Sequence, residues 1–126
     1  IACAIFLARK CSTKEKIKNY IEGEFDYNLS RSLDEVRKTC EFNETCSISV
    51  PEAIVAFLES ENFEDAIRNA VSLGGDADTQ AAIAGSIAEA FYEIPENLIL
   101  KCRKYLPQEI LKVIDRFNAE IFKNTD

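Results

Sequence analysis

Helix-start signals recur along this chain, and they constrain its fold more than any other feature. The form Ser-x-x-Glu occurs at Ser12–Glu15, Ser32–Glu35 and Ser49–Glu52. In this form the hydroxyl and the carboxylate bond the unpaired amides of a helix's first turn. A stretch of helix-compatible residues follows each one, so we expect helices over residues 14–22, 33–40 and 50–59.

Caps and breakers predict further helices toward the end of the chain. Asn62 precedes "FEDAIRNAVSL", whose apolar residues share one face, and Gly74 is placed to end that helix. The last helix begins near Pro107 and continues through "QEILKVIDRFNAEIF". Since the sequence has no clear strand pattern or repeat and its 126 residues suit one domain, we expect a single all-α domain over residues 1–126.

One more predicted helix starts near Asp78 or Thr79, runs to about Phe91 and is ended by Pro95. Its sequence "AAIAGSIAEA" is small or apolar almost all round, which predicts burial at the centre of the fold. Asp76, Asp78 and Thr79 then lie at the N-terminus of a buried helix. There the helix dipole and free amides partly offset the cost of holding carboxylates away from water.

Composition excludes several classes of function. A net charge of −7 provides no basic field for nucleic acid or anionic lipid, and the apolar run "IACAIFLA" is far shorter than the roughly 20 residues of a membrane span. There is no histidine, so any chemistry must come from carboxylates and hydroxyls. Five cysteines without a C-x-x-C pair indicate a reduced protein, which we expect in the cytoplasm.

The acidic segment before the small-residue helix allows two interpretations. Asp76 or Asp78 can simply be an N-cap that follows the glycines of a helix end. Alternatively Asp76, Asp78 and Thr79 supply hard oxygen ligands to a cation such as Mg²⁺, with further ligands from elsewhere. An EF-hand loop is excluded, because Ala81 and Ile87 stand where its Gly and Glu belong.

A long stretch that includes this segment resembles a known family. "FEDAIRNAVSLGGDADTQAAIAGSIAEAFYEIP" is similar to the C-terminal signature of the ADP-ribosylglycohydrolases, the group that includes dinitrogenase reductase-activating glycohydrolase. The upstream part, "YIEGEFDYNLSRSLDEVRKTCEFNETCSISVPEAIVAFLES", also resembles bacterial members, and the resemblance fades after about Leu106. It implies an all-α, orthogonal multi-helix bundle of the ADP-ribosylglycohydrolase type.

The resemblance also implies a site and a reaction. Asp76, Asp78 and Thr79 would be ligands of a binuclear Mg²⁺ or Mn²⁺ centre, with Asp78 bridging both ions and Asp76 a candidate catalytic carboxylate. Gly74 and Gly75 would let the backbone turn tightly and lie close to substrate. The substrate would be an ADP-ribosylated protein or an ADP-ribose derivative, attacked by water at the anomeric carbon through an oxocarbenium-like state.

The sequence departs from the family pattern in several places. Members carry a Thr-Asp-Asp cluster and a Gly-Asp motif near the N-terminus of a longer chain, and the N-terminal part of this sequence has neither. "CSIS" at Cys46–Ser49 stands where relatives often have Gln-Gly before the Ser, and Glu93 stands where Gly is common. We therefore expect the C-terminal half of a metal site in a chain truncated at its N-terminus.

Two further expectations follow. An apolar surface left exposed around residues 1–8 would favour self-association. The alternative function, from a different class, is a non-catalytic helical module that binds ADP-ribose or a partner protein and uses the acidic motif only as a cap.

Overall fold

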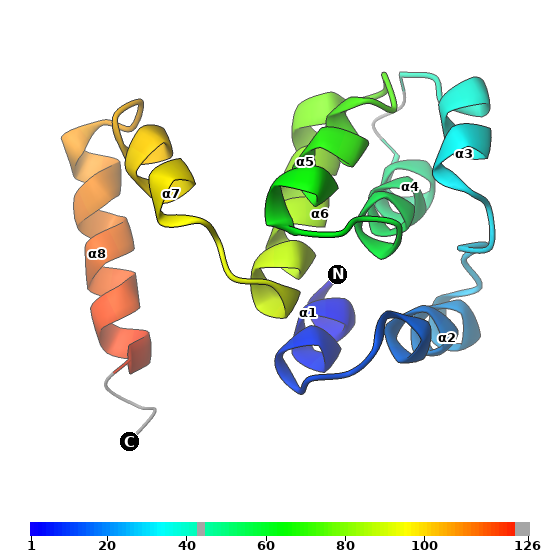
Figure 1. The fold of residues 1–126 in the computed structure, drawn as a ribbon, viewed down its shortest axis with the longest axis horizontal. Helices are drawn as coiled ribbons and strands as arrows, with labels where there is room; N and C mark the ends of the chain where they lie inside the picture. Colours follow the sequence, from blue (N-terminus) through cyan, green and yellow to red (C-terminus); the bar gives the residue numbers. More distant parts are fainter. Residues whose placement is uncertain (43–44, 123–126) are drawn as a thin grey trace. The chain divides into compact units, whose positions relative to one another are not determined.

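The computed structural model describes residues 1–42 and 45–122, with side-chain environments through residue 120. Over these residues the chain forms eight helices and no strand, which confirms the all-α prediction (Figure 1). They are α1 (Ala2–Arg9), α2 (Lys14–Phe25), α3 (Leu33–Thr39), α4 (Cys46–Leu58), α5 (Phe63–Val71), α6 (Ala77–Phe91), α7 (Glu96–Arg103) and α8 (Gln108–Phe122).

The chain divides into two compact units. The first, Ile1–Glu93, contains α1 to α6, and the second begins at Ile94 and contains α7 and α8. A single domain over residues 1–126 stays a prediction. None of the helices in the described ranges is both long enough and apolar enough to span a bilayer.

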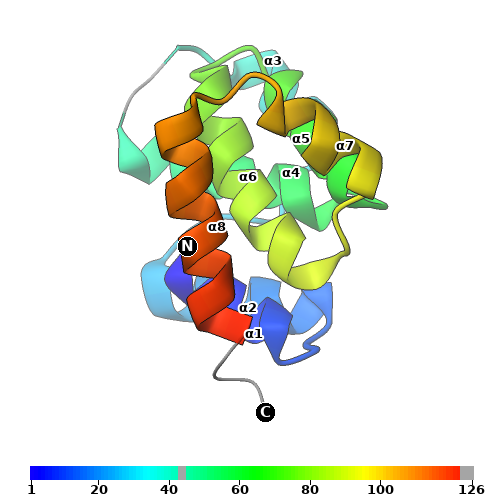
Figure 2. The same cartoon turned by 90° about the vertical axis from the view of Figure 1, so that its left-hand side faces the viewer.

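In the second unit, a short turn joins α7 and α8 (Figures 1 and 2). The Arg103 guanidinium on α7 donates to both carboxylate oxygens of Asp115 on α8, at 2.8 and 3.1 Å. The sequence analysis missed α7, because Pro95 was interpreted only as the end of the preceding helix. Pro95 also precedes α7 directly, a position that proline favours because its fixed φ suits a helix start.

Helix α4 forms the core of the first unit. Its residues from Ser49 to Phe57 are all buried, and it packs against α3, α5 and α6. Helix α6 packs against α1, α4 and α5, as a central helix should. Its burial is one-sided, however, since Ser86 and Glu89 are exposed opposite the buried Ala84 and Ile87.

Two of the predicted caps are confirmed and one is shifted. The Ser32 hydroxyl accepts from the Glu35 amide while the Glu35 carboxylate accepts from the Ser32 amide, which completes a capping box at α3. The Asn62 side chain caps α5 by accepting from the Asp65 amide at 2.9 Å. At α2 the cap is Thr13 rather than Ser12.

The predicted helix start at Ser49 is wrong. Helix α4 begins one turn earlier, where the amides of Ile48 and Ser49 donate to the Thr45 carbonyl at 3.1 and 3.0 Å. Proline favours the first turn of a helix, because it lacks the amide that a helix interior needs. In the structure Pro51 lies inside α4 instead, so Glu52 is part of the buried helix and not of a capping box.

The Lys14 ammonium group joins α2 to the C-terminal end of α4. Its Nζ donates to the carbonyl oxygens of Leu58, at 3.0 Å, and Ser60. These carbonyls lie where a helix leaves its last acceptors unpaired and carries partial negative charge. Lys14 therefore satisfies acceptors that α4 cannot satisfy itself.

Three aromatic rings surround the same ammonium group. Lys14 Nζ lies 5.4 Å from the ring centroids of Phe57 and Tyr92 and 5.9 Å from that of Phe91. The Tyr92 hydroxyl also donates to the Ser60 carbonyl at 2.7 Å. Since Phe91 ends α6 and Tyr92 follows it, the ammonium group holds the end of α6 against the end of α4.

We predict that Lys14→Met lowers the free energy of unfolding by about 2 kcal/mol, because it removes both the carbonyl bonds and the cation–π contacts. Urea denaturation followed by circular dichroism measures this change. The control is Lys16→Met, which removes an exposed ammonium group from the same helix and should have little effect. Equal stability of the two variants would contradict the role given to Lys14.

Candidate functional site

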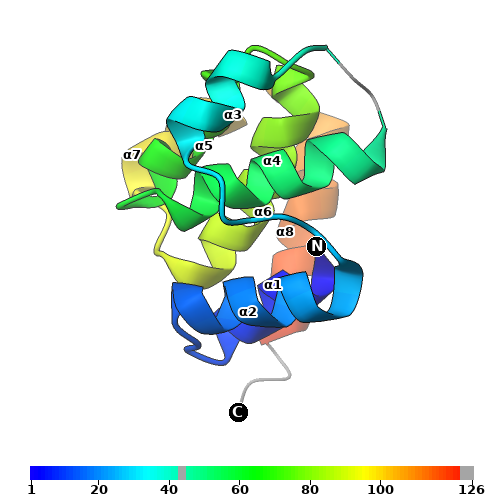
Figure 3. The same cartoon turned by 90° about the vertical axis from the view of Figure 1, so that its right-hand side faces the viewer.

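The segment that joins α5 to α6 carries the acidic motif. Helix α5 ends at Val71, and Gly74 has a φ of +82°, a backbone conformation that favours glycine. The Arg37 guanidinium on α3 donates to the Ser72 hydroxyl at 3.0 and 2.8 Å, which ties the segment to α3. Figures 1 and 3 show this segment at the α3 end of the first unit, with α1 and α2 at the opposite end.

Asp76 occupies the N-cap position of α6, one of the two candidates for a simple cap. Its carbonyl accepts the first helical bond, from the Gln80 amide at 2.9 Å. Its carboxylate, however, makes no capping hydrogen bond to the first turn, whose residues all lie within the described range. Asp76 therefore stands at the N-cap position but lacks the side-chain hydrogen bond through which an N-cap residue stabilises a helix.

The Asp78 carboxylate lies near both Asp76 and Thr79. Its Oδ1 accepts from the Thr79 amide at 3.0 Å. The pKa of Asp78 is lowered, first by a hydrogen bond with the Asp76 carboxyl group and then by the backbone amides of Thr79 and of Asp78 itself. Two carboxyl groups this close repel each other when both are ionised, and a cation between them would relieve that repulsion.

These side chains carry oxygen atoms of the kind that bind hard cations. Two carboxylates and the Thr79 hydroxyl are the oxygen donors that Mg²⁺ and Mn²⁺ prefer, and Asp78 and Thr79 are exposed while Asp76 is half-buried. Within the described ranges, no group of three or more His, Cys, Asp or Glu side chains could hold a metal ion. The donor set fits such a cation only when water, substrate or other segments complete the coordination.

A buried polar cluster lies next to the acidic motif, and sequence analysis missed it. Glu52 on α4 is 4% exposed and Gln80 on α6 is 1% exposed. Gln80 Nε2 donates to Glu52 Oε2 at 2.8 Å, and the Cys40 thiol donates to the same oxygen at 3.3 Å. Burial, followed by this bond to Glu52, raises the pKa of the Cys40 thiol.

One signal for this cluster was present in the sequence. Gln80, Ala84 and Ile87 share one helical face, so Gln80 is a polar residue on the apolar face that packs into the core. Glu52 carried no such signal, because the Ser-x-x-Glu form assigned it to a helix start.

Gly75 packs directly against the cluster. A Cβ atom on Gly75 would lie 2.9 Å from the Cys40 sulfur and 3.2 Å from both the Oε1 and Nε2 atoms of Gln80. Gly75 is thus required for close approach of the backbone to these side chains, whereas Gly74 is required for the turn. Closeness of either glycine to substrate stays a prediction.

We predict that Gly75→Ala lowers the free energy of unfolding by about 1–3 kcal/mol, because the new methyl group displaces Cys40 or Gln80. The matched control is Gly23→Ala in α2, where a Cβ would meet nothing within 4 Å. That control should gain about 0.5–1 kcal/mol from the helix propensity of alanine. Thermal unfolding measures both, and a change of the same sign in both variants would contradict the packing argument.

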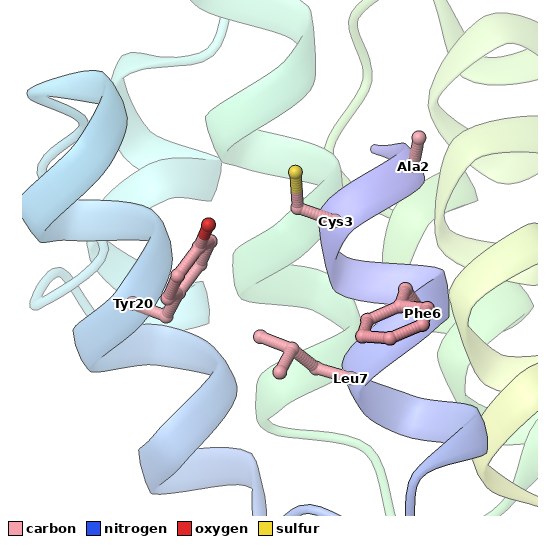
Figure 4. Close-up of a pocket in the computed structure, with 5 residues that line it drawn as sticks. All are labelled: Ala2, Cys3, Phe6, Leu7 and Tyr20. Carbon is pink, nitrogen blue, oxygen red and sulfur yellow. The ribbon is translucent and has the colours of Figure 1, made fainter.

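An apolar hollow of about 310 Å³ lies elsewhere, between α1 and α2 (Figure 4). Phe6 and Leu7 of α1 line it together with Tyr20 of α2, Ala2 and Cys3. None of the predicted site residues lines this hollow, and α1 and α2 lie at the end of the unit away from the acidic motif. It is therefore separate from the candidate metal site.

Comparison with known proteins places this chain in a family. A family profile described as ADP-ribosylglycohydrolase matches residues 3–126. The chain belongs to the ADP-ribosylglycohydrolase family. Membership confirms the resemblance found in the sequence, and the helical structure is consistent with an all-α fold of the ADP-ribosylglycohydrolase type.

Two curated relatives are similar to this ADP-ribosylglycohydrolase chain. An uncharacterized protein of Archaeoglobus fulgidus is 38% identical over 69 residues, which cover 52% of this chain and 23% of the relative. The ADP-ribosylhydrolase ARH3 of Homo sapiens is 38% identical over 77 residues, which cover 50% of this chain and 21% of ARH3. The matches thus span less than a quarter of either relative, and no solved structure gives a significant match.

Proposed function

We propose that the protein hydrolyses ADP-ribosyl linkages, N- or O-glycosidic, and that this chain contributes Asp76, Asp78 and Thr79 to a divalent-metal centre. Family membership supports the type of reaction. The observation that carries the site is the Asp76 carboxylate, which occupies the N-cap position of α6 without a capping bond, two residues before the exposed Asp78. The chain covers less than a quarter of its relatives, so further ligands can come from outside these residues.

Asp76, Asp78 and Thr79 would hold Mg²⁺ or Mn²⁺, the complete centre would be binuclear, and Asp78 would be the ligand shared by both ions. Such ions supply a Lewis acid that orients ribose hydroxyls and lowers the pKa of a bound water. The half-buried Asp76 carboxylate would be the candidate to accept a proton from the attacking water. In a chain of net charge −7, bound cations would also offset repulsion of an anionic substrate.

The substrate class is an ADP-ribosylated protein or an ADP-ribose derivative. The name of ARH3, an ADP-ribosylhydrolase, supports this class. The bond to the anomeric carbon of the distal ribose breaks through an oxocarbenium-like state as water adds. The five free cysteines support a reducing compartment such as the cytoplasm.

A second candidate function is a non-catalytic module that binds ADP-ribose or a partner protein. In the described part of the chain, the lack of any group of three metal-binding acidic, cysteine or histidine side chains favours it. Binding of ADP-ribose that persists in a chelator would support this alternative over the metal-dependent hydrolase.

We predict that Mn²⁺ binds the wild-type chain and that Asp78→Asn abolishes detectable binding, because the variant loses the bridging carboxylate. Isothermal titration calorimetry at neutral pH, after removal of chelator, measures this. The control is Asp34→Asn, which neutralises an exposed aspartate in the first turn of α3 and should bind Mn²⁺ like the wild type. Equal binding by all three proteins would refute Asp78 as a ligand.

We also propose that the chain self-associates through the apolar surface of α1 and α2. Phe6 on α1 is 61% exposed, and Tyr20 on α2 and Ile1, directly before α1, are also exposed. Clustered exposed apolar side chains favour association because it removes them from water.

Sedimentation velocity over a wide concentration range should therefore show dimers or larger species that Phe6→Ser shifts toward monomer. Phe42→Ser, which changes a similarly exposed ring after α3, should not shift them. A wild-type chain that stays monomeric throughout would contradict self-association.

A further inference from the structure

The buried pair of Glu52 and Gln80 is costly for a protein core. Both side chains are more than nine-tenths buried, and Gln80 Oε1 is a buried oxygen without a hydrogen-bond partner among the described residues. Burying polar groups costs free energy unless every donor and acceptor is paired, and apolar side chains of similar volume would avoid that cost. A buried, partly unpaired polar group therefore requires an explanation.

Gln80 contacts the acidic motif in two ways. Its backbone amide donates to the Asp76 carbonyl at 2.9 Å. Its side-chain amide packs against Gly75, the residue directly before Asp76. One residue thus fixes the backbone on both sides of the Asp76 carboxylate.

Glu52 fixes the Gln80 side chain in turn. It accepts from Gln80 Nε2 at 2.8 Å, and it is carried by α4, whose buried run makes it the most enclosed helix of the first unit. Cys40, which follows α3, donates its thiol to the same Glu52 oxygen, and its sulfur packs against Gly75. The cluster therefore joins α3, α4 and α6 beneath the motif.

We propose that Glu52 and Gln80 are positioning residues that hold Gly75 and the Asp76 backbone, so that the Asp76 and Asp78 carboxyl groups stay close together before a cation binds. The proposal rests on the metal-site function proposed above. Residues that hold the ligands of a metal ion in place raise the affinity of the site for that ion, because the ligands are already arranged before it binds. The polar cluster is then retained because it orders the motif, although an apolar core would cost less.

Hydrogen–deuterium exchange, measured on the full chain in the presence of chelator, tests the positioning without any metal. Gln80→Leu keeps the approximate volume but removes the amide. We expect the amides of residues 75–79 to exchange about fivefold faster, the equilibrium factor that corresponds to one net hydrogen bond. The control Ile87→Val changes a fully buried residue two turns further along the same face of α6 and should leave exchange in residues 75–79 unchanged.

A conservative variant separates positioning from packing. In Glu52→Gln the amide oxygen still accepts from Gln80 Nε2, so exchange in residues 75–79 should stay close to wild type, whereas Glu52→Leu should match Gln80→Leu. Cys40→Ala removes only the thiol against Gly75 and serves as the milder variant if Gln80→Leu does not fold. The proposal would be overturned if exchange in residues 75–79 stayed unchanged in Gln80→Leu. If Gln80→Leu does not fold, unchanged exchange in Cys40→Ala would overturn it. An equal rise in the control Ile87→Val would also overturn it.

Mn²⁺ titration of the same proteins distinguishes this proposal from the proposed function. If wild type binds Mn²⁺, Gln80→Leu should weaken binding about tenfold, the effect typical of losing an outer-shell partner. If wild type binds no Mn²⁺ but Gln80→Leu accelerates exchange in residues 75–79, the positioning role stands and the metal function fails. Unchanged Mn²⁺ affinity in Gln80→Leu, with wild type binding, would overturn the positioning role.

Discussion

The contact of the Lys14 ammonium group with the end of α4 is the interaction on which the arrangement of the first unit depends. Here a full positive charge meets the carbonyls of Leu58 and Ser60 and the faces of three aromatic rings. Because these groups come from α4, α6 and the residues that follow them, one charge fixes three helices. The same charge would be costly in this place without those partners.

Helix α4 contacts α6 at two places. Near its C-terminal end, Phe57 packs edge-on against Phe91 and Tyr92 at the end of α6. Midway along α4, Glu52 accepts a hydrogen bond from Gln80 in the first turn of α6. The start of α6, and with it the acidic motif, is therefore placed by contacts to one buried helix and not by the connecting segment alone.

This arrangement is compatible with the hard-cation site proposed for an acidic, histidine-free chain. The carboxylates of Asp76 and Asp78 lie at the N-terminal end of α6, where Asp78 and Thr79 are exposed, while the preceding Gly75 packs against Cys40 and Gln80. Rigid support below and exposed donors above suit a site that shares its cation with ligands from elsewhere. The reaction proposed for this site follows from the family to which the chain belongs.

The sequence by itself determined the helical class, the caps at Ser32 and Asn62, and the motif that identified the family, because these depend on contacts within a few residues. It did not determine the role of Glu52. A Ser-x-x-Glu form can begin a helix or lie inside one, and only packing of α4 against α6 decides between them. Likewise, only the tertiary structure brought Cys40, Glu52 and Gln80 beneath Gly75, since residues this far apart in sequence meet through packing.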